Sequence, residues 1–300
     1  MSKRDFLDHQ LIGQLMGLPL HARHPMMGSI SGKHASPIRG SSLEFAEYRK
    51  YVPGDDLRRL DWKAWGRSDR FYIKEFEADT NLRLCLIVDT SGSMAFTPEG
   101  SSSKIDFARQ IAGYLAYLAI QQGDAVGFYC AGKGFNKEIP PRRNPAHLSV
   151  VLDNLAGMEA EGETGLPEAL HEAAEKIPQR ALVVVISDLF IDPTILNECF
   201  QHLKFRRHDV AIFHLLSKAE IEFPFDRPTR FVDMEDHSSM LVDPTLIASQ
   251  YDLSLQNYLA QIDTVAQSTG SDYQRVLLPA DPGQTLADFL IRRTPKKGGV

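Results

Sequence analysis

The chain has 300 residues, 43% of them hydrophobic, which suffices for a buried core in one large domain or a domain with an extension. Its formal net charge of −6 is modest, so bulk charge gives no indication of nucleic-acid binding. No apolar run approaches the roughly 18 residues of a membrane-spanning helix, and polar residues interrupt the N-terminus before a signal-peptide core can form. Three widely spaced cysteines favour buried thiols over disulfides. We therefore expect a cytoplasmic protein without a membrane span.

Residues 1–80 do not alternate regularly between strands and helices, and we expect an extension that packs on the rest of the chain. Residues 18–40 are rich in Gly, Ser, Pro and His, which predicts a loop. The following residues, up to about 79, are dense in aromatic and charged side chains and are predicted to be ordered. Acidic residues among the basic ones argue against a nucleic-acid surface.

Residues 81–293 alternate short apolar runs with amphipathic segments, followed by a basic tail at 294–300. Expected strands cover residues 83–89, 124–130, 181–187, 208–215 and 273–278, with an edge strand near 134–139 that ends at two prolines. Helices are expected near residues 104–122, 146–156, 166–177, 193–205, 244–268 and 283–292, and a hairpin over 229–233 and 239–242. This order predicts an α/β fold: a doubly wound, mostly parallel sheet with helices on both faces.

One strand leads directly into a group of oxygen-bearing side chains. Asp89, Ser91 and Ser93 follow the strand at 83–89 within one tight turn. Asp188 follows the strand at 181–187, and Thr164 lies in a loop between glycines. Ligands of open α/β sheets bind at the carboxyl ends of strands near the switch in strand order, and Mg²⁺ prefers oxygen ligands. The spacing therefore predicts a site for Mg²⁺ or Mn²⁺.

Two alternatives stay open for this group. Asp, Ser and Gly after a strand also form ordinary capped turns without a metal. Thr164 is the weakest member, because Glu161 or Glu163 beside it could serve instead.

The order and spacing of these residues resemble the metal-ion-dependent adhesion site of von Willebrand factor A domains. In that family the two Ser and the Thr contact the metal, and the Asp residues act directly or through water. An acidic group of a partner often completes the metal shell. Over residues 82–280 the resemblance implies a von Willebrand A-like domain whose metal ligands are Asp89, Ser91, Ser93, Thr164 and Asp188.

A second resemblance covers the N-terminal block. It resembles the signature of the domain-of-unknown-function 58 family in the segments Arg39–Arg49, Tyr51–Arg58, Asp61–Trp62 and Tyr72–Phe76. That family is bacterial and archaeal, joins such a block to a von Willebrand A-like domain, and is often encoded beside MoxR-type AAA+ ATPases. The resemblance implies a MoxR-type ATPase as partner. It also favours a structural or partner-binding role for this block, with Arg and aromatic side chains as the contacts: Arg58, Trp62, Trp65 and Arg67.

Together these patterns predict a non-enzymatic adaptor whose bound metal captures an acidic residue of a partner. The alternative is a Mg²⁺-dependent phosphatase or hydrolase that uses Asp89 as nucleophile. Haloacid-dehalogenase-like phosphatases carry a second Asp two positions further on, where this chain has Ser91. The catalytic set for that chemistry is incomplete, so we expect no enzyme.

Overall fold

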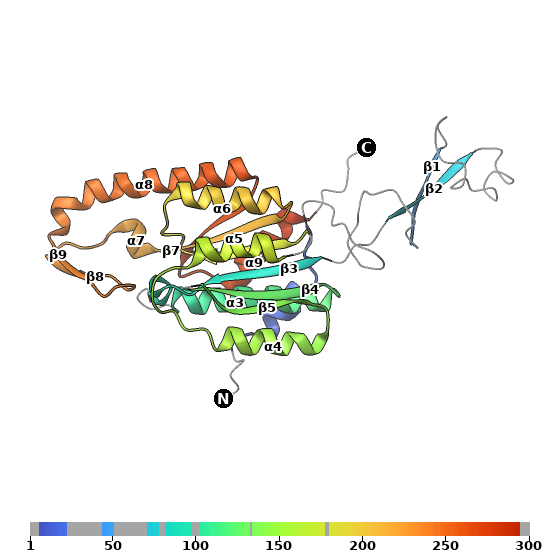
Figure 1. Cartoon of the computed structure of the whole chain (residues 1–300), viewed down its shortest axis with the longest axis horizontal. Coiled ribbons are helices and arrows are strands. Elements are labelled where there is room, and N and C mark those ends of the chain that lie inside the picture. Colours follow the sequence, from blue (N-terminus) through green and yellow to red (C-terminus); the bar gives the residue numbers. More distant parts are fainter. Residues whose placement is uncertain are drawn as a thin grey trace.

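A six-stranded sheet forms the centre of the computed structural model of the chain (Figure 1). The structure describes residues 6–22, 44–50, 71–77, 82–97, 102–132, 134–177 and 180–294. The strands of the sheet lie in the order β10 (Asp272–Leu278), β7 (Asp209–Ser217), β6 (Leu182–Ser187), β3 (Arg83–Asp89), β4 (Ala125–Gly132) and β5 (Gly134–Arg142). All neighbours are parallel except β4 and β5. The predicted doubly wound, mostly parallel sheet is confirmed.

The direction of strand addition reverses between β3 and β6. From β3 the chain adds β4 and β5 on one side, then returns to add β6, β7 and β10 on the other. Crossover connections leave this pair from opposite faces, which opens a crevice at the carboxyl ends of the two strands. The antiparallel β5 pairs only with β4, as expected for a strand that contains Pro140 and Pro141 and lacks two ladder donors.

Helices cover both faces of the sheet because the buried strands present apolar side chains alternately to each side. In β3, Leu84, Leu86 and Val88 join the core on one face, whereas Cys85 and Ile87 join the core on the other. The first face is covered by α3 (Lys104–Gln121), α4 (Pro145–Ala156) and α9 (Pro282–Arg293). The second face is covered by α5 (Leu166–Lys176), α6 (Pro193–Phe205) and α8 (Pro244–Thr269).

Local sequence signals set the helix ends. Ser103 caps α3 by accepting a hydrogen bond from the Asp106 N–H, and Gly123 follows the helix at a φ of 82°. Every helix expected from the sequence between residues 104 and 293 forms within two residues of its predicted bounds. All three cysteines are free and buried, as predicted. In the described segments, no helix is both long and apolar enough to cross a membrane.

The N-terminal segment contributes to the core of the main domain. The helix α1 (His9–Leu15) packs near α3 and α9 and buries Ile12 and Leu15, and the Asp8 N–H donates to Tyr114 Oη at 2.8 Å. Further along, β1 (Glu44–Lys50) and β2 (Tyr72–Glu77) pair as an antiparallel two-stranded sheet with one irregularity. The candidate partner-binding residues lie outside the described residues: Arg58, Trp62, Trp65 and Arg67. The same holds for residues 23–40 of the predicted loop and 295–300 of the predicted tail.

Four short elements lie at the carboxyl-end side of the sheet. The turn after β3 forms the 3₁₀ helix η2 (Gly92–Ala95), and α7 (Lys218–Glu222) follows β7. The predicted hairpin is confirmed as β8 (Thr229–Val232) and β9 (Ser239–Val242). The sequence analysis did not find η2 or α7, because three to five residues are too few to show a helical period.

Candidate metal centre

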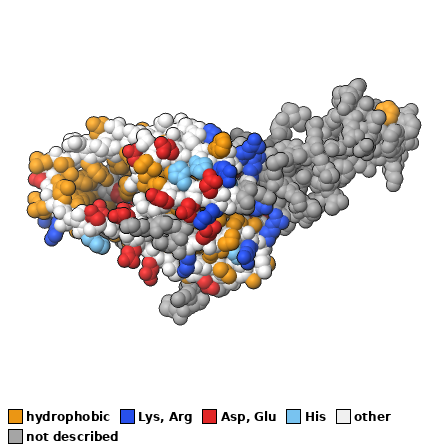
Figure 2. Space-filling model, in the orientation of Figure 1, with side chains coloured by type: hydrophobic (Ala, Val, Ile, Leu, Met, Phe, Trp, Pro, Cys, Tyr) orange, Lys and Arg blue, Asp and Glu red, His pale blue; other side chains and the backbone are white. Residues whose placement is uncertain are grey.

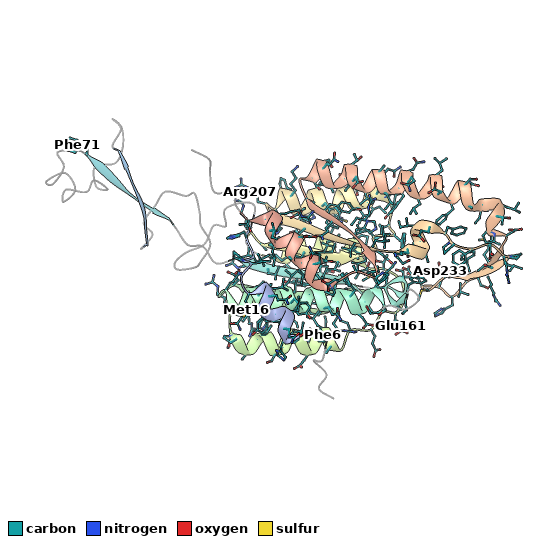
Figure 3. All side chains as sticks on the ribbon, turned by 180° about the vertical axis from the view of Figure 1, so that it is seen from behind. Phe6, Met16, Phe71, Glu161, Arg207 and Asp233 are labelled. Carbon is teal, nitrogen blue, oxygen red and sulfur yellow. The ribbon has the colours of Figure 1, made fainter. Side chains whose placement is uncertain are left out.

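The two aspartates predicted as metal ligands lie at the switch in strand order. Asp89 is the last residue of β3, and Asp188 directly follows β6, the strand that pairs with β3. Both are buried, with 2% and 1% of their surface exposed. In Figure 3, Glu161 and Asp233 mark the end of the domain at which the loops of this site lie, and Arg207 marks the opposite end. The position agrees with the general rule for ligand sites in open α/β sheets.

The turn after β3 brings two hydroxyls together. Asp89 Oδ1 accepts a hydrogen bond from the Ser91 N–H at 2.9 Å, which closes the turn, and Asp89 Oδ2 accepts one from Ser187 Oγ at 2.6 Å. Ser91 Oγ and Ser93 Oγ are 3.0 Å apart. An octahedral Mg²⁺ with oxygen ligands at about 2.0–2.1 Å would hold neighbouring ligands about 2.9 Å apart. The spacing of the two serine hydroxyls therefore fits adjacent positions on such an ion.

The loop that carries Thr164 is hydrogen-bonded to this turn. The Gly92 N–H donates to Gly162 O at 2.8 Å, and the Glu161 N–H donates to Thr90 O at 3.0 Å. Thr164 Oγ1 accepts a hydrogen bond from the Leu166 N–H at 3.3 Å, at the start of α5. The side chains of Glu161 and Glu163 are exposed, whereas Thr164 is half-buried. The fold thus places the Thr164 loop directly beside the serine turn.

The electrostatics of the site are unfavourable for two ionised aspartates. Burial, together with the negative charge of Asp188, raises the pKa of Asp89 to about 7. The hydrogen bonds from Ser187 and Ser91 oppose this rise but do not cancel it. A cation bound between the loops would favour the ionised form of both carboxylates.

A buried lysine, which the sequence analysis missed, occupies one side of the site. Lys104, the first residue of α3, is 0% exposed, and its Nζ lies 2.9 Å from Asp188 Oδ2 and 2.6 Å from Glu220 Oε1. The ammonium also lies 5.9 Å and 5.0 Å from the ring centroids of Phe96 and Phe190. One oxygen of Asp188 is therefore committed to Lys104. One feature of the sequence could have identified Lys104: a lysine in the first turn of a helix is unusual, because the helix dipole disfavours a cation there.

Two glutamates complete the acidic surroundings. Glu220 caps α7 by accepting from the Ser217 N–H at 2.7 Å while it also binds Lys104. Glu235, in the β8–β9 turn, is half-buried, and its carboxylate lies near enough to the Thr164 backbone for that group to oppose the rise in its pKa. Burial and the charges of nearby Asp188, Asp233 and Glu163 raise the pKa of Glu235. No short-range sequence pattern links either glutamate to Asp89, so neither could be identified as part of the site from the sequence.

The donor set suits a hard divalent cation held largely by neutral groups. Within the described residues, no three side chains of His, Cys, Asp or Glu converge as a metal cluster. Two hydroxyls, the threonine loop and two buried aspartates do converge, with one ammonium to balance four carboxylates: Asp89, Asp188, Glu220 and Glu235. Such a set fits Mg²⁺ or Mn²⁺, which retain several waters and tolerate few charged ligands.

Fold and site together define an α/β protein with buried aspartates and serine hydroxyls at the switch point of its sheet. Residues 47–254 match the family described as "Protein of unknown function DUF58", so the chain belongs to that family. The uncharacterized protein Rv1480 of Mycobacterium tuberculosis is 28% identical over 228 residues, covering 75% of this chain and 71% of that protein. The uncharacterized protein YeaD of Bacillus subtilis is 28% identical over 62% of this chain and 44% of its own length.

Solved structures similar to this chain include the conserved hypothetical protein BatB from Bacteroides thetaiotaomicron. It is 14% identical, with a TM-score of 0.48 over 71% of this chain and 98% of that chain. The SpRpn10 VWA domain is also 14% identical, with a TM-score of 0.40 over 74% of this chain and all of that domain.

Proposed function

We propose that this protein is a non-enzymatic adaptor that binds Mg²⁺ or Mn²⁺ and uses the ion to capture an acidic residue of a partner protein. The observation that carries the proposal is the pair of hydroxyls, Ser91 Oγ and Ser93 Oγ, 3.0 Å apart beside the buried Asp89 and Asp188. Thr164, on the adjoining loop, supplies a third neutral oxygen.

The chemistry of the donor set supports capture of a carboxylate. Hydroxyls and waters leave most of the charge of a divalent ion unneutralised, so the ion keeps affinity for one more anionic ligand. Of the two aspartates, Asp89 accepts two hydrogen bonds within the protein and Asp188 pairs with Lys104. Both carboxylates would therefore hold the ion while sharing their charge with other groups.

The surface around this end of the domain supports a protein partner. Figure 2 shows hydrophobic side chains gathered over the end that carries β8, β9 and the start of α8. The exposed apolar residues of these elements and of the neighbouring loop after β6 are Phe190, Val232, Met234, Met240, Leu241, Leu246 and Leu253. An exposed apolar patch beside a polar site is typical of an interaction surface. The partner would present an acidic residue flanked by apolar ones.

The identity of the partner rests on the family resemblance. Because the domain-of-unknown-function 58 family is often encoded beside MoxR-type AAA+ ATPases, we propose such an ATPase in the cytoplasm as the partner, in protein assembly or remodelling. The exposed apolar patch would then be part of the contact between the adaptor and the ATPase.

The enzymatic alternative receives less support from the geometry. As a phosphatase nucleophile, Asp89 would need a second acidic side chain two positions further on to protonate the leaving group. The residue two positions on, Ser91, is a poor proton donor at neutral pH. We therefore propose that Asp89 is a metal ligand rather than a nucleophile.

Titration calorimetry tests the proposal. Mg²⁺ and Mn²⁺ are titrated into metal-stripped wild-type protein and into Asp89→Ala, with circular dichroism to confirm that the variant folds. We expect saturable one-site binding in the wild type and its loss in Asp89→Ala. Pull-down of a MoxR-type ATPase should then depend on Mg²⁺ and fail with a chelator. Partner binding that survives both the chelator and Asp89→Ala would contradict metal-bridged capture.

A further inference from the structure

The β8–β9 hairpin lies directly on the predicted metal-binding turn. A Cβ atom added at Gly92 would lie 2.0 Å from Met234 O and 3.3 Å from Glu235 Cα, a clash that no rotamer change relieves because the contacts are to backbone. Only glycine allows this approach, since any other residue would push the hairpin away. The backbone of residues 234 and 235 is therefore seated on the residue between Ser91 and Ser93.

The hairpin turn points one carboxylate toward the site. Asp233 Oδ1 accepts hydrogen bonds from the Glu235 N–H at 2.7 Å and the Asp236 N–H at 3.3 Å, and the Asp233 N–H donates to Ser238 O at 2.8 Å. From residue 232 to 239, Glu235 alone is half-buried, and the others are exposed. Its Cα lies beside Gly92, and its carboxylate lies close enough to the Thr164 backbone and to Asp188 for both to affect its pKa.

Apart from this contact, the hairpin is loosely held. Its two strands have four residues each and pair only with each other, and Val232, Met240 and Leu241 are 56%, 67% and 74% exposed. Phe231 anchors its base by packing against Phe223 and Phe225. Two-stranded hairpins are marginally stable by themselves. The turn can therefore leave the site while the aromatic base stays in place.

We infer that Glu235 is an internal ligand-mimic: in the free protein its carboxylate faces the metal position from the β8–β9 turn, where the acidic residue of a partner would bind. The inference rests on the proposed metal site. A partner must displace the hairpin turn to reach the ion, so partner binding and hairpin opening are coupled. The exchange replaces one carboxylate by another and leaves the charge of the site unchanged.

This coupling would make the site select a partner that contacts both the ion and the apolar surface over an isolated acidic side chain. An isolated acidic side chain meets an ion that already has an internal carboxylate, and the internal ligand has the advantage of high effective concentration. A partner that also covers the exposed apolar residues of β9 and α8 gains the additional binding energy needed to displace it.

The experiment compares Glu235→Gln with Asp236→Asn, an isosteric change at a fully exposed neighbour in the same turn. Mn²⁺ is titrated into metal-stripped full-length variants, and water-proton relaxation reports the waters bound to the ion. We expect Glu235→Gln to weaken Mn²⁺ binding by about tenfold and to raise relaxation per bound ion, because water replaces the carboxylate. Acetate added to the Mn²⁺-loaded protein should lower relaxation in Glu235→Gln at concentrations that leave the wild type unchanged. Asp236→Asn should behave as wild type.

Hydrogen exchange provides a second readout. Mg²⁺ should slow amide exchange over residues 229–242 in the wild type and in Asp236→Asn, but not in Glu235→Gln. Saturable Mn²⁺ binding with the same affinity, hydration and acetate response in Glu235→Gln and Asp236→Asn would overturn the inference alone. An absence of saturable Mn²⁺ binding in the wild type, or equal binding in Asp89→Ala, would overturn the proposed function and the inference with it.

Discussion

Lys104 offers the sharpest test of the charge balance at the site. Its ammonium binds Asp188 and Glu220 at 2.9 Å and 2.6 Å with no exposed side-chain surface. The substitution Lys104→Met removes the charge and keeps an unbranched apolar side chain of similar length, so the packing against Phe96 and Phe190 is largely preserved. What remains is two carboxylates without their buried counter-charge.

The expected cost follows from burial. Removing one partner of a buried ion pair typically costs about 3–5 kcal/mol, because the other charge is left uncompensated in a poorly solvated position. Asp188 is 2% exposed at its side chain, so water replaces the ammonium poorly there, whereas Glu220 is 19% exposed and recovers some solvation. We therefore expect Lys104→Met to lower the free energy of unfolding by about 3–5 kcal/mol in the absence of divalent cations.

Lys176 is a matched control. It also binds two carboxylates, Glu138 at 3.0 Å and Glu172 at 3.1 Å, but its side chain is 46% exposed. Because exposed pairs contribute little, Lys176→Met should lower the free energy of unfolding much less than Lys104→Met does.

Urea unfolding of both variants, with chelator and with millimolar Mg²⁺, measures the difference. Mg²⁺ binds only the native site, so it should stabilise every variant that keeps the site. The gain should be larger for Lys104→Met than for the wild type or Lys176→Met, because there the ion also replaces the missing positive charge. A cost for Lys104→Met no larger than that for Lys176→Met would refute the reasoning.

Two further predictions concern stability away from the site. Gly13→Ala should raise the free energy of unfolding by about 0.5–1 kcal/mol, because alanine favours the helix and its Cβ meets nothing within 4 Å. Gly113→Ala should lower it by about 1 kcal/mol, since its Cβ lies 2.7 Å from Phe6 and 2.9 Å from Leu7, and equal effects of the two changes in thermal unfolding would contradict this. Burial lowers the pKa of His208 to about 4, so the unfolded chain binds the extra proton. The free energy of unfolding should therefore fall by up to about 3 kcal/mol as the pH drops from 6.5 toward 4, and this fall should be smaller in His208→Gln.

The sequence by itself determined the elements of the fold and their order. Apolar runs of strand length ended at turn residues, and helix signals such as Ser103 and Gly123 are local, because caps and periodicity depend on neighbours within one or two turns. The alternation of strands and helices predicted a mostly parallel sheet, which placed Asp89 and Asp188 at its carboxyl edge before any contact was known. The order of the strands within the sheet came from the structure. The pairing of Ser91 with Ser93 is equally local, since both lie in one turn.

The tertiary structure alone decided which charges surround that edge. Lys104 lies 84 residues from Asp188 and 116 from Glu220, and Glu235 approaches through a hairpin turn seated on Gly92. Nothing local distinguishes these residues from other charged residues of the chain, since burial and charge pairing depend on elements that are distant in sequence. The chain order therefore specified which edge of the sheet carries Asp89 and Asp188, and only the packing of α3, α7 and the hairpin on that edge specified which other charges surround them.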